Sequence, residues 1–386
     1  MKFSRRTQHL TASLVREILA VAQQPDVISF AGGLPATELM PALKVNEIPA
    51  SLNQYGESQG EPALRMTIAQ HLKSLGLRCT DQQIVVTTGS QQGIDLISKL
   101  LIDEGTLVGV EQPTYLAALQ CFRFFGAQFV ELPLDESGLN LSELRTRLSK
   151  TRPAFVYLIP NFQNPTGSCY QSANRQAVAA LLDELEIGLI EDEPYRDLVY
   201  DACDRTPICH YLQRAPWVYL GSFSKVAIPA LRIGYLACDE RLYAPLLKLK
   251  QASDLHSNRW GQWLLNEFVN SSDYPAHLAR LAHFYRAKRD AMQTALSQHF
   301  SDLGTWQIPQ GGLFFWVKLH QSIDTLALLE DALAKKVAFM PGNPFFAESS
   351  SQYAALRLNF SHSSPGQIET GLAILAQLIR QRINAQ

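Results

Sequence analysis

The 386-residue sequence has no long hydrophobic run and almost no net charge. No stretch approaches the roughly 20 consecutive apolar residues that span a bilayer, and residues 1–24 lack the continuous apolar core of a signal peptide. A net charge of −2 gives no field that would draw the whole protein to nucleic acid or to an acidic membrane. We therefore expect a protein that is not exported and that has neither a nucleic-acid nor a membrane partner.

Cysteine is present but follows no metal-binding or redox pattern. The six cysteines lie at positions 79, 121, 169, 203, 209 and 238, with no C-x-x-C pair and no zinc-finger spacing to histidine. A chain of this length can bury a large core without disulfides. We expect free thiols, a cytoplasmic location and no metal site.

Short apolar runs alternate with helical patterns from about residue 80 onward. Runs such as "QIVVTTG", "TLVGVEQ" and "WVYLGS" predict an α/β fold with a mostly parallel sheet that helices cover on both faces. After about residue 270, a long helical stretch, the strand "GGLFFWVKL" and further short elements predict a smaller α+β domain. The segment "ISFAGGLP" does not fit the parallel series, and we expect it to pack beside that smaller domain. Ligands in such sheets bind at the carboxyl ends of the strands.

The stretch "SFSKVAIPALRIGY" places Lys225 directly after the apolar run "WVYLG". Burial disfavours the ammonium form of lysine, so a shielded lysine has a lowered pKa and can form an imine with an aldehyde. The hydroxyls of Ser222 and Ser224 and the guanidinium of Arg232 are groups that bind phosphate. The segment suggests an imine-forming amine beside a phosphate site, and the alternative is a surface lysine near serines.

Two other strand ends carry polar residues. In "TTGSQQG", a strand is followed by a glycine and then by Ser90 and Gln91 at the start of a helix. The free backbone N–H groups of such a helix start can bind an anion. The alternative is an ordinary helix cap, which has the same sequence pattern. In "EDEPYRD", Asp192 and Tyr195 close a strand. A carboxylate there could keep a pyridine nitrogen protonated, and the alternative is a solvated acidic loop.

Three further residues could complete a site at these strand ends. Asn164 in "PNFQNPTG" could donate a hydrogen bond, and Tyr115 in "EQPTYLAAL" could give an aromatic face to a flat ring. An ordinary turn and a packed tyrosine are the alternatives. Arg357, inside the apolar strand "ALRLNFS", needs an anionic partner if it is half-buried, either a structural carboxylate or that of a substrate.

The order of these motifs resembles one enzyme family over nearly the whole chain. "NPTG", "EDEPY", "SFSK…P…LR.GY" and "LRLNFS" are similar to motifs of the fold-type I, class I/II aminotransferases, which use pyridoxal 5′-phosphate (PLP). "ISFAGGLP", "TTGSQQG", "YLGSFSK" and "GGLFFWV" resemble the subgroup of 2-aminoadipate and kynurenine aminotransferases and MocR-type catalytic domains. The resemblance implies a mostly parallel, seven-stranded sheet in a large domain (45–275) and a small α+β domain formed by 1–44 and 276–386.

The resemblance also implies a role for each candidate residue. Lys225 would bind the cofactor aldehyde and move a proton, Asp192 would pair with the pyridine nitrogen, and Tyr115 would stack on the ring. Tyr195 and Asn164 would hydrogen-bond the phenolic oxygen of the ring. The phosphate would be held by Ser90, Gln91, Ser222, Ser224, Arg232 and, from the neighbouring subunit of a homodimer, Tyr55. The substrate α-carboxylate would be bound by Arg357, Asn164 and the backbone at Gly33.

The implied reaction moves the amino group of an L-amino acid to a 2-oxo acid, with 2-oxoglutarate as the expected acceptor and a ping-pong order. Arg16, in "LTASLVREIL", matches an arginine that binds a distal carboxylate in the subgroup. This favours 2-aminoadipate or glutamate and leaves aromatic or branched side chains open, and the alternative is that Arg16 is an exposed helix residue.

Two rival functions share the same scaffold. One is a different PLP reaction, such as that of a β-lyase or a decarboxylase. The other is the ligand-sensing half of a MocR-type regulator. Such regulators carry an N-terminal winged-helix domain, for which the roughly 27 residues before "ISFAGGLP" are too few, so we expect an enzyme.

Replacement of Arg16 tests the substrate prediction. In Arg16→Ala we expect kcat/KM for 2-aminoadipate and glutamate to fall by about tenfold or more, because a charge-assisted hydrogen bond contributes on the order of 1.5–3 kcal/mol. The same constant for leucine and phenylalanine should change much less. Equal losses for both substrate classes would remove Arg16 from the specificity argument.

Overall fold

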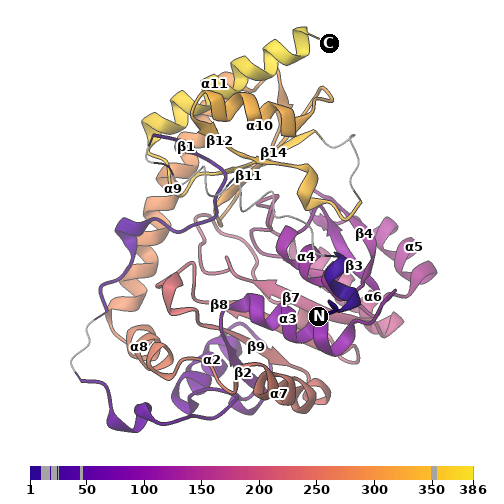
Figure 1. The fold of residues 1–386 in the computed structure, drawn as a ribbon, viewed down its shortest axis with the longest axis vertical. Helices are drawn as coiled ribbons and strands as arrows, with labels where there is room; N and C mark the ends of the chain where they lie inside the picture. Colours follow the sequence, from indigo (N-terminus) through magenta and orange to yellow (C-terminus); the bar gives the residue numbers. More distant parts are fainter. Residues whose placement is uncertain (10–17, 19–23, 25, 44–46, 349–353, 386) are drawn as a thin grey trace.

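The computed structural model describes residues 1–9, 18, 24, 26–43, 47–348 and 354–385. Its largest element is an eight-stranded sheet in the order β2-β9-β8-β7-β6-β3-β4-β5 (Figure 1). The strands are β2 (Ile84–Thr87), β3 (Leu107–Gln112), β4 (Gln128–Asp135), β5 (Gly138–Leu139), β6 (Phe155–Leu158), β7 (Gly188–Glu193), β8 (Trp217–Ser222) and β9 (Gly234–Cys238). The predicted α/β class is therefore confirmed.

The strand pairing agrees with a mostly parallel sheet. Strands β4, β3, β6, β7 and β8 pair in parallel, whereas β9 is antiparallel to both β8 and β2. Seven strands were predicted and all seven are present. The eighth, β5, has only two residues and folds back on the end of β4 through a turn at residues 136–137. It was too short to leave a sequence pattern.

Helices cover both faces of this sheet. One face packs against α3 (Ser90–Leu101), α4 (Leu116–Phe124) and α7 (Glu240–Asp254). The other face packs against α2 (Pro62–Ser74), α5 (Leu141–Thr151), α6 (Ser172–Leu185) and α8 (Arg259–Val269). Within β8, Val218 and Leu220 face the first group and Tyr219 faces the second. Burial on both faces explains why the strands read as nearly continuous apolar runs.

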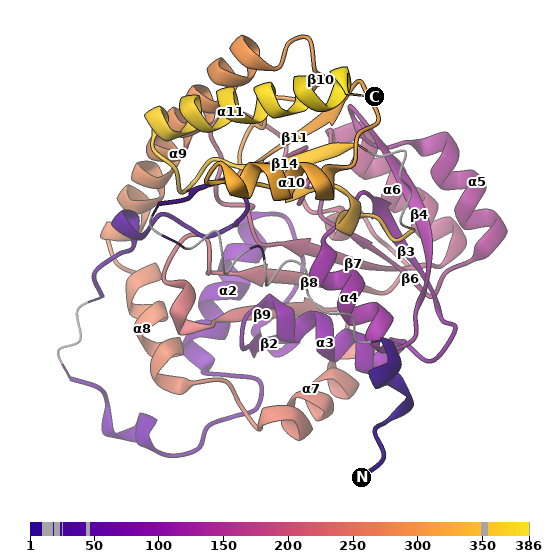
Figure 2. The same ribbon diagram turned by 45° about the horizontal axis from the view of Figure 1, so that its top comes forward.

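The remaining elements form a smaller unit above the large sheet in Figure 1. An antiparallel sheet joins β10 (Gly304–Thr305), β11 (Phe314–Leu319), β14 (Ala355–Asn359) and β13 (Met340–Pro341). Helices α10 (Thr325–Ala334) and α11 (Pro365–Asn384) lie over it, and the long helix α9 (Asp273–His299) runs from beside α8 to α11 (Figures 1 and 2). We call this the small unit, and the eight-stranded sheet with its helices the large unit.

The N-terminal segment contacts both units. Strand β1 (Ile28–Ser29) pairs in parallel with β12 (Val337–Ala338) of the small unit, as expected for "ISFAGGLP". The short 3-10 helix Arg5–His9 instead contacts α4, where the Arg6 guanidinium lies 5.2 Å from the centre of the Phe125 ring. The boundaries drawn at 44/45 and 275/276 stay predictions.

The topology brings several chain segments to one edge of the large sheet. The carboxyl ends of β3, β6, β7 and β8 lie side by side because these strands are parallel neighbours. Strand β2 points the same way and runs through Gly89 into α3. Every candidate segment that follows a strand of the large sheet therefore lies at the same edge of that sheet.

A core substitution tests the packing of the central strands. Leu220 is fully buried in β8 and packs directly on Gly93 of α3. A Cβ atom added to Gly93 would lie only 2.6 Å from Leu220 Cδ2. We expect Leu220→Ala to lower the free energy of unfolding by about 3 kcal/mol, because the cavity cannot collapse fully against a rigid sheet. Leu326→Ala, on the outer side of α10 at 37% exposure, should lower it by less than about 0.5 kcal/mol. Urea unfolding followed by circular dichroism measures both, and equal effects would contradict the assigned packing.

Candidate active site

A cavity of about 140 Å³ lies at the edge where the strands end. It is lined by Ser90, Gln91, Tyr115, Ile159, Asn164, Asp192, Pro194, Tyr195, Ser222, Ser224, Lys225 and Arg232. Ten of these twelve were candidates from the sequence, and they come from five separate segments. The other two, Ile159 and Pro194, were not candidates, because their side chains contribute only apolar surface.

One end of the cavity is suited to an anion. Helix α3 begins at Ser90 after Gly89, whose φ of +75° lets the chain turn sharply, so the first N–H groups of the helix face outward. The Arg232 guanidinium packs so closely on this turn that a Cβ on Gly89 would lie 2.5 Å from its Nη2. Ser222 and Ser224 line the same cavity, and the Ser224 N–H donates to Ser222 Oγ at 3.2 Å. A phosphate is the anion that matches this combination of donors.

Lys225 projects into the cavity from the segment after β8. Its Nζ donates to the backbone oxygen of Gly33 at 2.8 Å and lies 5.8 Å from the centre of the Tyr195 ring. Burial, with a smaller contribution from the positive charges of Arg357 and Arg232, lowers the pKa of Lys225 from 10.5 to about 8. Roughly 10–20% of this amine is therefore neutral near physiological pH, far more than of an ordinary lysine, and able to act as a nucleophile or a base.

Asp192 is held by a tyrosine on the neighbouring strand. The Tyr157 hydroxyl donates to Asp192 Oδ2 at 2.6 Å, whereas Oδ1 is buried and has no hydrogen-bond partner among the described residues. Burial raises the pKa of Asp192 to about 6, against the opposing effect of the Tyr157 hydrogen bond. An unpartnered buried carboxylate oxygen is costly and fits a missing donor such as a protonated ring nitrogen.

The strand alternation separates the acids of "EDEPY". Glu191 and Glu193 point to the opposite face of β7 from Asp192, where Glu191 accepts from the N–H groups of Ile208 and Cys209. Tyr157 was not among the predicted residues. A hydroxyl-bearing residue in a strand that is otherwise apolar was its only sequence signal, because a buried hydroxyl needs a partner.

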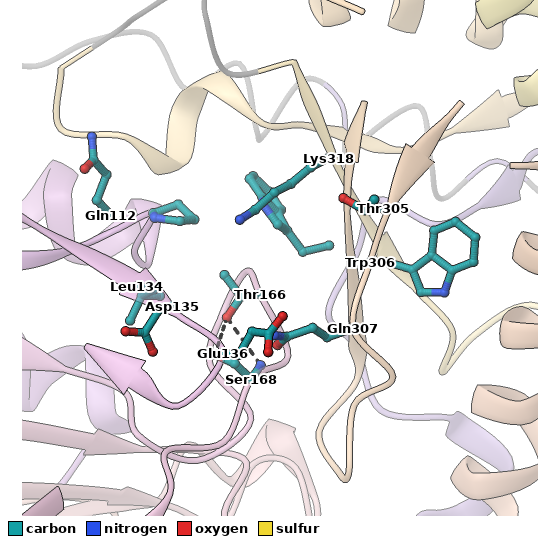
Figure 3. Close-up of a pocket in the computed structure, with 12 residues that line it drawn as sticks. Gln112, Leu134, Asp135, Glu136, Thr166, Ser168, Thr305, Trp306, Gln307 and Lys318 are labelled. Carbon is teal, nitrogen blue, oxygen red and sulfur yellow. Dashed lines mark hydrogen bonds between the residues drawn. The ribbon is translucent and has the colours of Figure 1, made fainter. Parts of the chain in front are cut away.

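The turn that contains Asn164 connects the cavity to the small unit. Asn164 Nδ2 donates to the Tyr195 hydroxyl at 3.4 Å, and its Oδ1 accepts from Arg357 Nη1 at 2.9 Å. Gln163 braces the turn by accepting from the N–H and the hydroxyl of Thr166, and it donates to the buried Glu111. Figure 3 shows the outer side of the turn, where the Thr166 and Ser168 hydroxyls are hydrogen-bonded and line a second cavity.

Glu111 is a second residue that the sequence did not reveal. Its carboxylate accepts from the Ile159 N–H, Gln163 Nε2 and the Tyr170 hydroxyl, so it ties the end of β3 to both ends of the Asn164 turn. Burial raises the pKa of Glu111 to about 7. Its role is to position the turn, since it does not line the cavity.

Arg357 reaches the site from β14 of the small unit. Its Nη2 donates to the backbone oxygen of Ala31 at 2.6 Å, and its guanidinium lies 4.4 Å from the centre of the Phe314 ring. Nε is buried without a partner, and no carboxylate pairs with Arg357 in the part of the chain that the structure describes. Burial lowers the pKa of Arg357 to about 10. A buried guanidinium without a counter-ion is suited to bind a carboxylate ligand.

The structure does not bring every candidate together. Gly33 adjoins the cavity through its carbonyl, but Tyr55 is 77% exposed and packs edge-on against the His256 ring, away from the cavity. Arg16 lies outside the described residues. Within the described ranges, no group of three or more His, Cys, Asp or Glu side chains could hold a metal ion. No helix in those ranges is both long and apolar enough to cross a membrane.

Comparison with known proteins identifies the family. Residues 25–375 match the family "Aminotransferase class I and II", and the chain belongs to it. Its members are PLP-dependent aminotransferases, and the buried donors, the unpaired Asp192 oxygen and Lys225 fit that cofactor. The chain is therefore a PLP-dependent enzyme with the fold of type I aminotransferases.

Particular relatives narrow the subgroup. The chain is 35% identical to aromatic-amino-acid aminotransferase 1 of Thermococcus litoralis, over 99% of this chain and 94% of the relative. It superposes on the Pyrococcus horikoshii kynurenine aminotransferase in complex with PMP with a TM-score of 0.93, at 34% identity and 98% and 97% coverage. It also matches the alpha-aminoadipate aminotransferase LysN of Thermus thermophilus, complexed with N-(5′-phosphopyridoxyl)-L-leucine, with a TM-score of 0.90, 32% identity and 100% and 98% coverage. The predicted resemblance to the 2-aminoadipate and kynurenine subgroup is confirmed.

The protonation of Lys225 can be followed by chemical labelling. In the protein freed of cofactor, a small acylating reagent should modify Lys225 with a midpoint near pH 8, because only the neutral amine reacts and its pKa is lowered from 10.5 to about 8. In Arg357→Met the midpoint should rise part of the way toward 10.5, since one positive charge is removed while burial, the larger cause, remains. Peptide mass spectrometry across pH 6–11 measures both, and a wild-type midpoint near 10.5 would contradict the assigned burial.

Proposed function

We propose that this protein transfers the amino group of an L-amino acid to a 2-oxo acid at the cavity around Lys225. The observation that supports this most directly is the convergence of three groups. These are an amine of lowered pKa on Lys225, an unpartnered carboxylate oxygen on Asp192 and an unpaired guanidinium on Arg357. Each is costly to bury alone, and each matches one part of a PLP-bound amino acid.

The cavity residues divide by the part of the cofactor that each would bind. The N-terminus of α3 and the polar groups at that end would bind the phosphate, and they belong to Ser90, Gln91, Ser222, Ser224 and Arg232. Tyr115, at the start of α4, would lie against the ring, and Asp192 would accept from the ring nitrogen. Asn164 and Tyr195, which already hydrogen-bond each other, would donate to the ring oxygen. When bound, PLP supplies an aldehyde that links to amines and a ring that stabilises negative charge at the substrate Cα.

Lys225 would both anchor the cofactor and carry the proton. Its Nζ donates to the Gly33 carbonyl, inside a cavity whose burial lowers the pKa of the amine and so raises its neutral fraction. A neutral amine at this position can take a proton from the substrate Cα and return it to a neighbouring carbon. General base catalysis of this kind contributes on the order of 10²–10⁴-fold to rate.

Arg357 would bind the substrate α-carboxylate. Two of its nitrogens are fixed by Asn164 Oδ1 and the Ala31 carbonyl, so the side chain is already oriented before a substrate arrives. The neighbouring Phe314 ring excludes water from the guanidinium and thereby strengthens its interaction with an anion. The backbone at Gly33 would border the same carboxylate.

The choice of substrate remains part of the proposal. The names of the relatives favour aromatic amino acids, kynurenine and 2-aminoadipate as amino donors. We propose 2-oxoglutarate as the acceptor and a ping-pong order, with Arg16 as the group that would select a distal carboxylate. A panel of twenty amino acids plus 2-aminoadipate and kynurenine, each assayed against 2-oxoglutarate, would rank the donors.

The proposal includes a homodimer and a cytoplasmic location. Tyr55 is large, aromatic and 77% exposed, and we propose that it reaches the phosphate site of a second subunit. All six cysteines are free thiols, which supports a reducing compartment.

A half-reaction separates amino transfer from the other PLP reactions. Given L-glutamate and no acceptor, the enzyme should release one equivalent of 2-oxo acid per active site and then stop. A β-lyase would instead release ammonia continuously from a β-substituted amino acid, and a decarboxylase would release carbon dioxide. A MocR-type regulator would bind upstream DNA in a mobility-shift assay, and we expect no shift.

The identity of the reactive amine can be tested by substitution. Lys225→Ala should lower kcat by at least about 1000-fold, because it removes both the covalent anchor and the base. Borohydride reduction of the wild-type holoenzyme should attach the cofactor to the tryptic peptide that contains Lys225. Lys73→Ala, an exposed position on α2, should keep both properties. Multiple turnover in Lys225→Ala, or a label on another peptide, would overturn the assignment.

A further inference from the structure

Two cysteines face each other on the flank of the active site. Cys169 follows the turn that carries Asn164, and Cys203 lies in the loop between β7 and β8. Both thiols are partly exposed, and both line a cavity of about 390 Å³. Each thiol shifts the pKa of the other, so the two side chains are close neighbours. Cys169 Sγ lies 3.5 Å from the carbonyl oxygen of Asp204, the residue after Cys203, and 3.4 Å from Asn161 Oδ1, and its single proton can be donated to either oxygen. The sequence pattern alone, which has no C-x-x-C motif, gave no sign of this pair.

The surroundings of the pair favour a reactive thiolate on Cys203. Its contact with Cys169 lowers the pKa of Cys203 to about 7, and the positive charges of Arg205 and Arg175 act in the same direction, against burial and Asp204. The same contact, with burial, raises the pKa of Cys169, so Cys203 carries the negative charge of the pair and Cys169 keeps its proton. Arg175 is itself fully buried, and its Nη2 donates to Cys169 Sγ at 3.5 Å. A thiolate beside a guanidinium and a second thiol is the arrangement in which cysteine oxidation is selective.

The other four cysteines have a different environment. Burial raises the pKa of Cys79 and Cys121 to about 11 and that of Cys238 to about 12, and Cys209 is also shifted upward. None of these four lines the cavity. Cys79 is partly exposed, like Cys169 and Cys203, so it serves as a matched control.

Hydrogen bonds connect the pair to the active site. Asn161 Oδ1 accepts from both Cys169 Sγ and Arg175 Nη2, and Asn161 Nδ2 donates to Glu193 Oε1 at 2.5 Å. Glu193 directly follows Asp192 on β7. On the other side, the chain from Cys169 leads back through Ser168 and Thr166 to Asn164, which holds Arg357 and Tyr195. A movement of Cys169 would therefore displace residues next to Asp192 on one side of the cavity and Asn164 on the other side.

The same turn also borders the second cavity. Glu136, Ser168 and Gln307 line both the cavity of the cysteine pair and the cavity of about 300 Å³ in Figure 3, where their side chains gather at one wall. Small oxidants thus have an aqueous approach to Cys203 that does not pass through the cavity around Lys225.

We propose that Cys169 and Cys203 are a reversible oxidation site, at which a hydroperoxide closes a disulfide that lowers turnover. The Cys203 thiolate attacks the hydroperoxide ROOH, so that the O–O bond breaks, a sulfenic acid forms and RO⁻ takes a proton from water. The Cys169 sulfur then attacks the sulfenic sulfur, the S–S bond forms and the S–O bond breaks. The hydroxide that leaves combines with the Cys169 proton as water. Two thiols are oxidised, and the hydroperoxide is reduced to an alcohol and water.

Closure of the disulfide would act by displacing the Asn164 turn. It removes the hydrogen bond that Cys169 donates to Asn161 or Asp204 and ties the turn to the Cys203 loop. Asn164 then holds Arg357 less accurately, so we expect KM for the amino donor to rise and kcat/KM to fall by about tenfold or more.

Peptide mapping tests the disulfide without any activity assay. The holoenzyme is reduced, freed of reductant, treated with hydrogen peroxide and digested with trypsin under non-reducing conditions. The expected product links peptide 151–175 to peptide 197–205, each of which holds one cysteine, while Cys209 lies on a separate peptide. Dithiothreitol should release the link. Failure to find it, with both cysteines over-oxidised or unmodified instead, would overturn the proposal.

Variants test the effect on turnover. Peroxide should lower kcat/KM of the wild type and of Cys79→Ser, with recovery on dithiothreitol, whereas Cys169→Ser and Cys203→Ser should lose the link and resist the same dose. The proposal would be overturned if the disulfide formed without a change in kcat/KM. It would also be overturned if peroxide lowered kcat/KM of Cys203→Ser as much as that of the wild type. The disulfide is detected by peptide mass, so its absence does not depend on any activity assay. A failure of the proposed aminotransferase function would instead appear as a reduced enzyme without activity.

Discussion

The removal of charged side chains from water is the constraint on which the site depends. The carboxyl ends of parallel strands meet at one edge, and helices and the small unit cover that edge, so Lys225, Asp192 and Arg357 lie in a poorly hydrated space. Burial is the largest cause of the shifted pKa values of all three. A charge buried without its partner costs several kcal/mol, so such a site is stable only because the large core around it supplies the excess. The strain is relieved when a ligand brings the missing partners.

The turn around Asn164 makes the two units depend on each other. Glu111 and Gln163 fix it to the large sheet, while Arg357 of the small unit hydrogen-bonds to Asn164 itself. A carboxylate bound to Arg357 would therefore pull on a residue that itself lines the cavity. This gives a physical route by which binding of the correct substrate aligns the groups that react.

Much of the fold could be predicted because burial on both faces leaves a strong signal. Seven strands of the large sheet were readable as apolar runs, and only the two-residue β5 was not. The candidate cavity residues were readable for a second reason, since polar groups directly after apolar strands must lie at the ends of the sheet. Tyr157 and Glu111 could not be predicted, because each lies inside a strand and acts only through a residue that is distant in the sequence. The exposure of Tyr55 and the pairing of Cys169 with Cys203 likewise depend on contacts between distant segments.

The sequence by itself determined the alternation of strands and helices, the chemical types of the reactive groups and the resemblance to aminotransferases. These follow from local patterns, in which periodicity and composition are enough. Only the tertiary structure decided which polar groups would lack partners, such as Asp192 Oδ1 and the Arg357 guanidinium, and which thiols would meet. The physical reason is that hydration and hydrogen bonding are properties of a three-dimensional neighbourhood. Residues far apart in the chain create that neighbourhood only when the strands have been brought side by side.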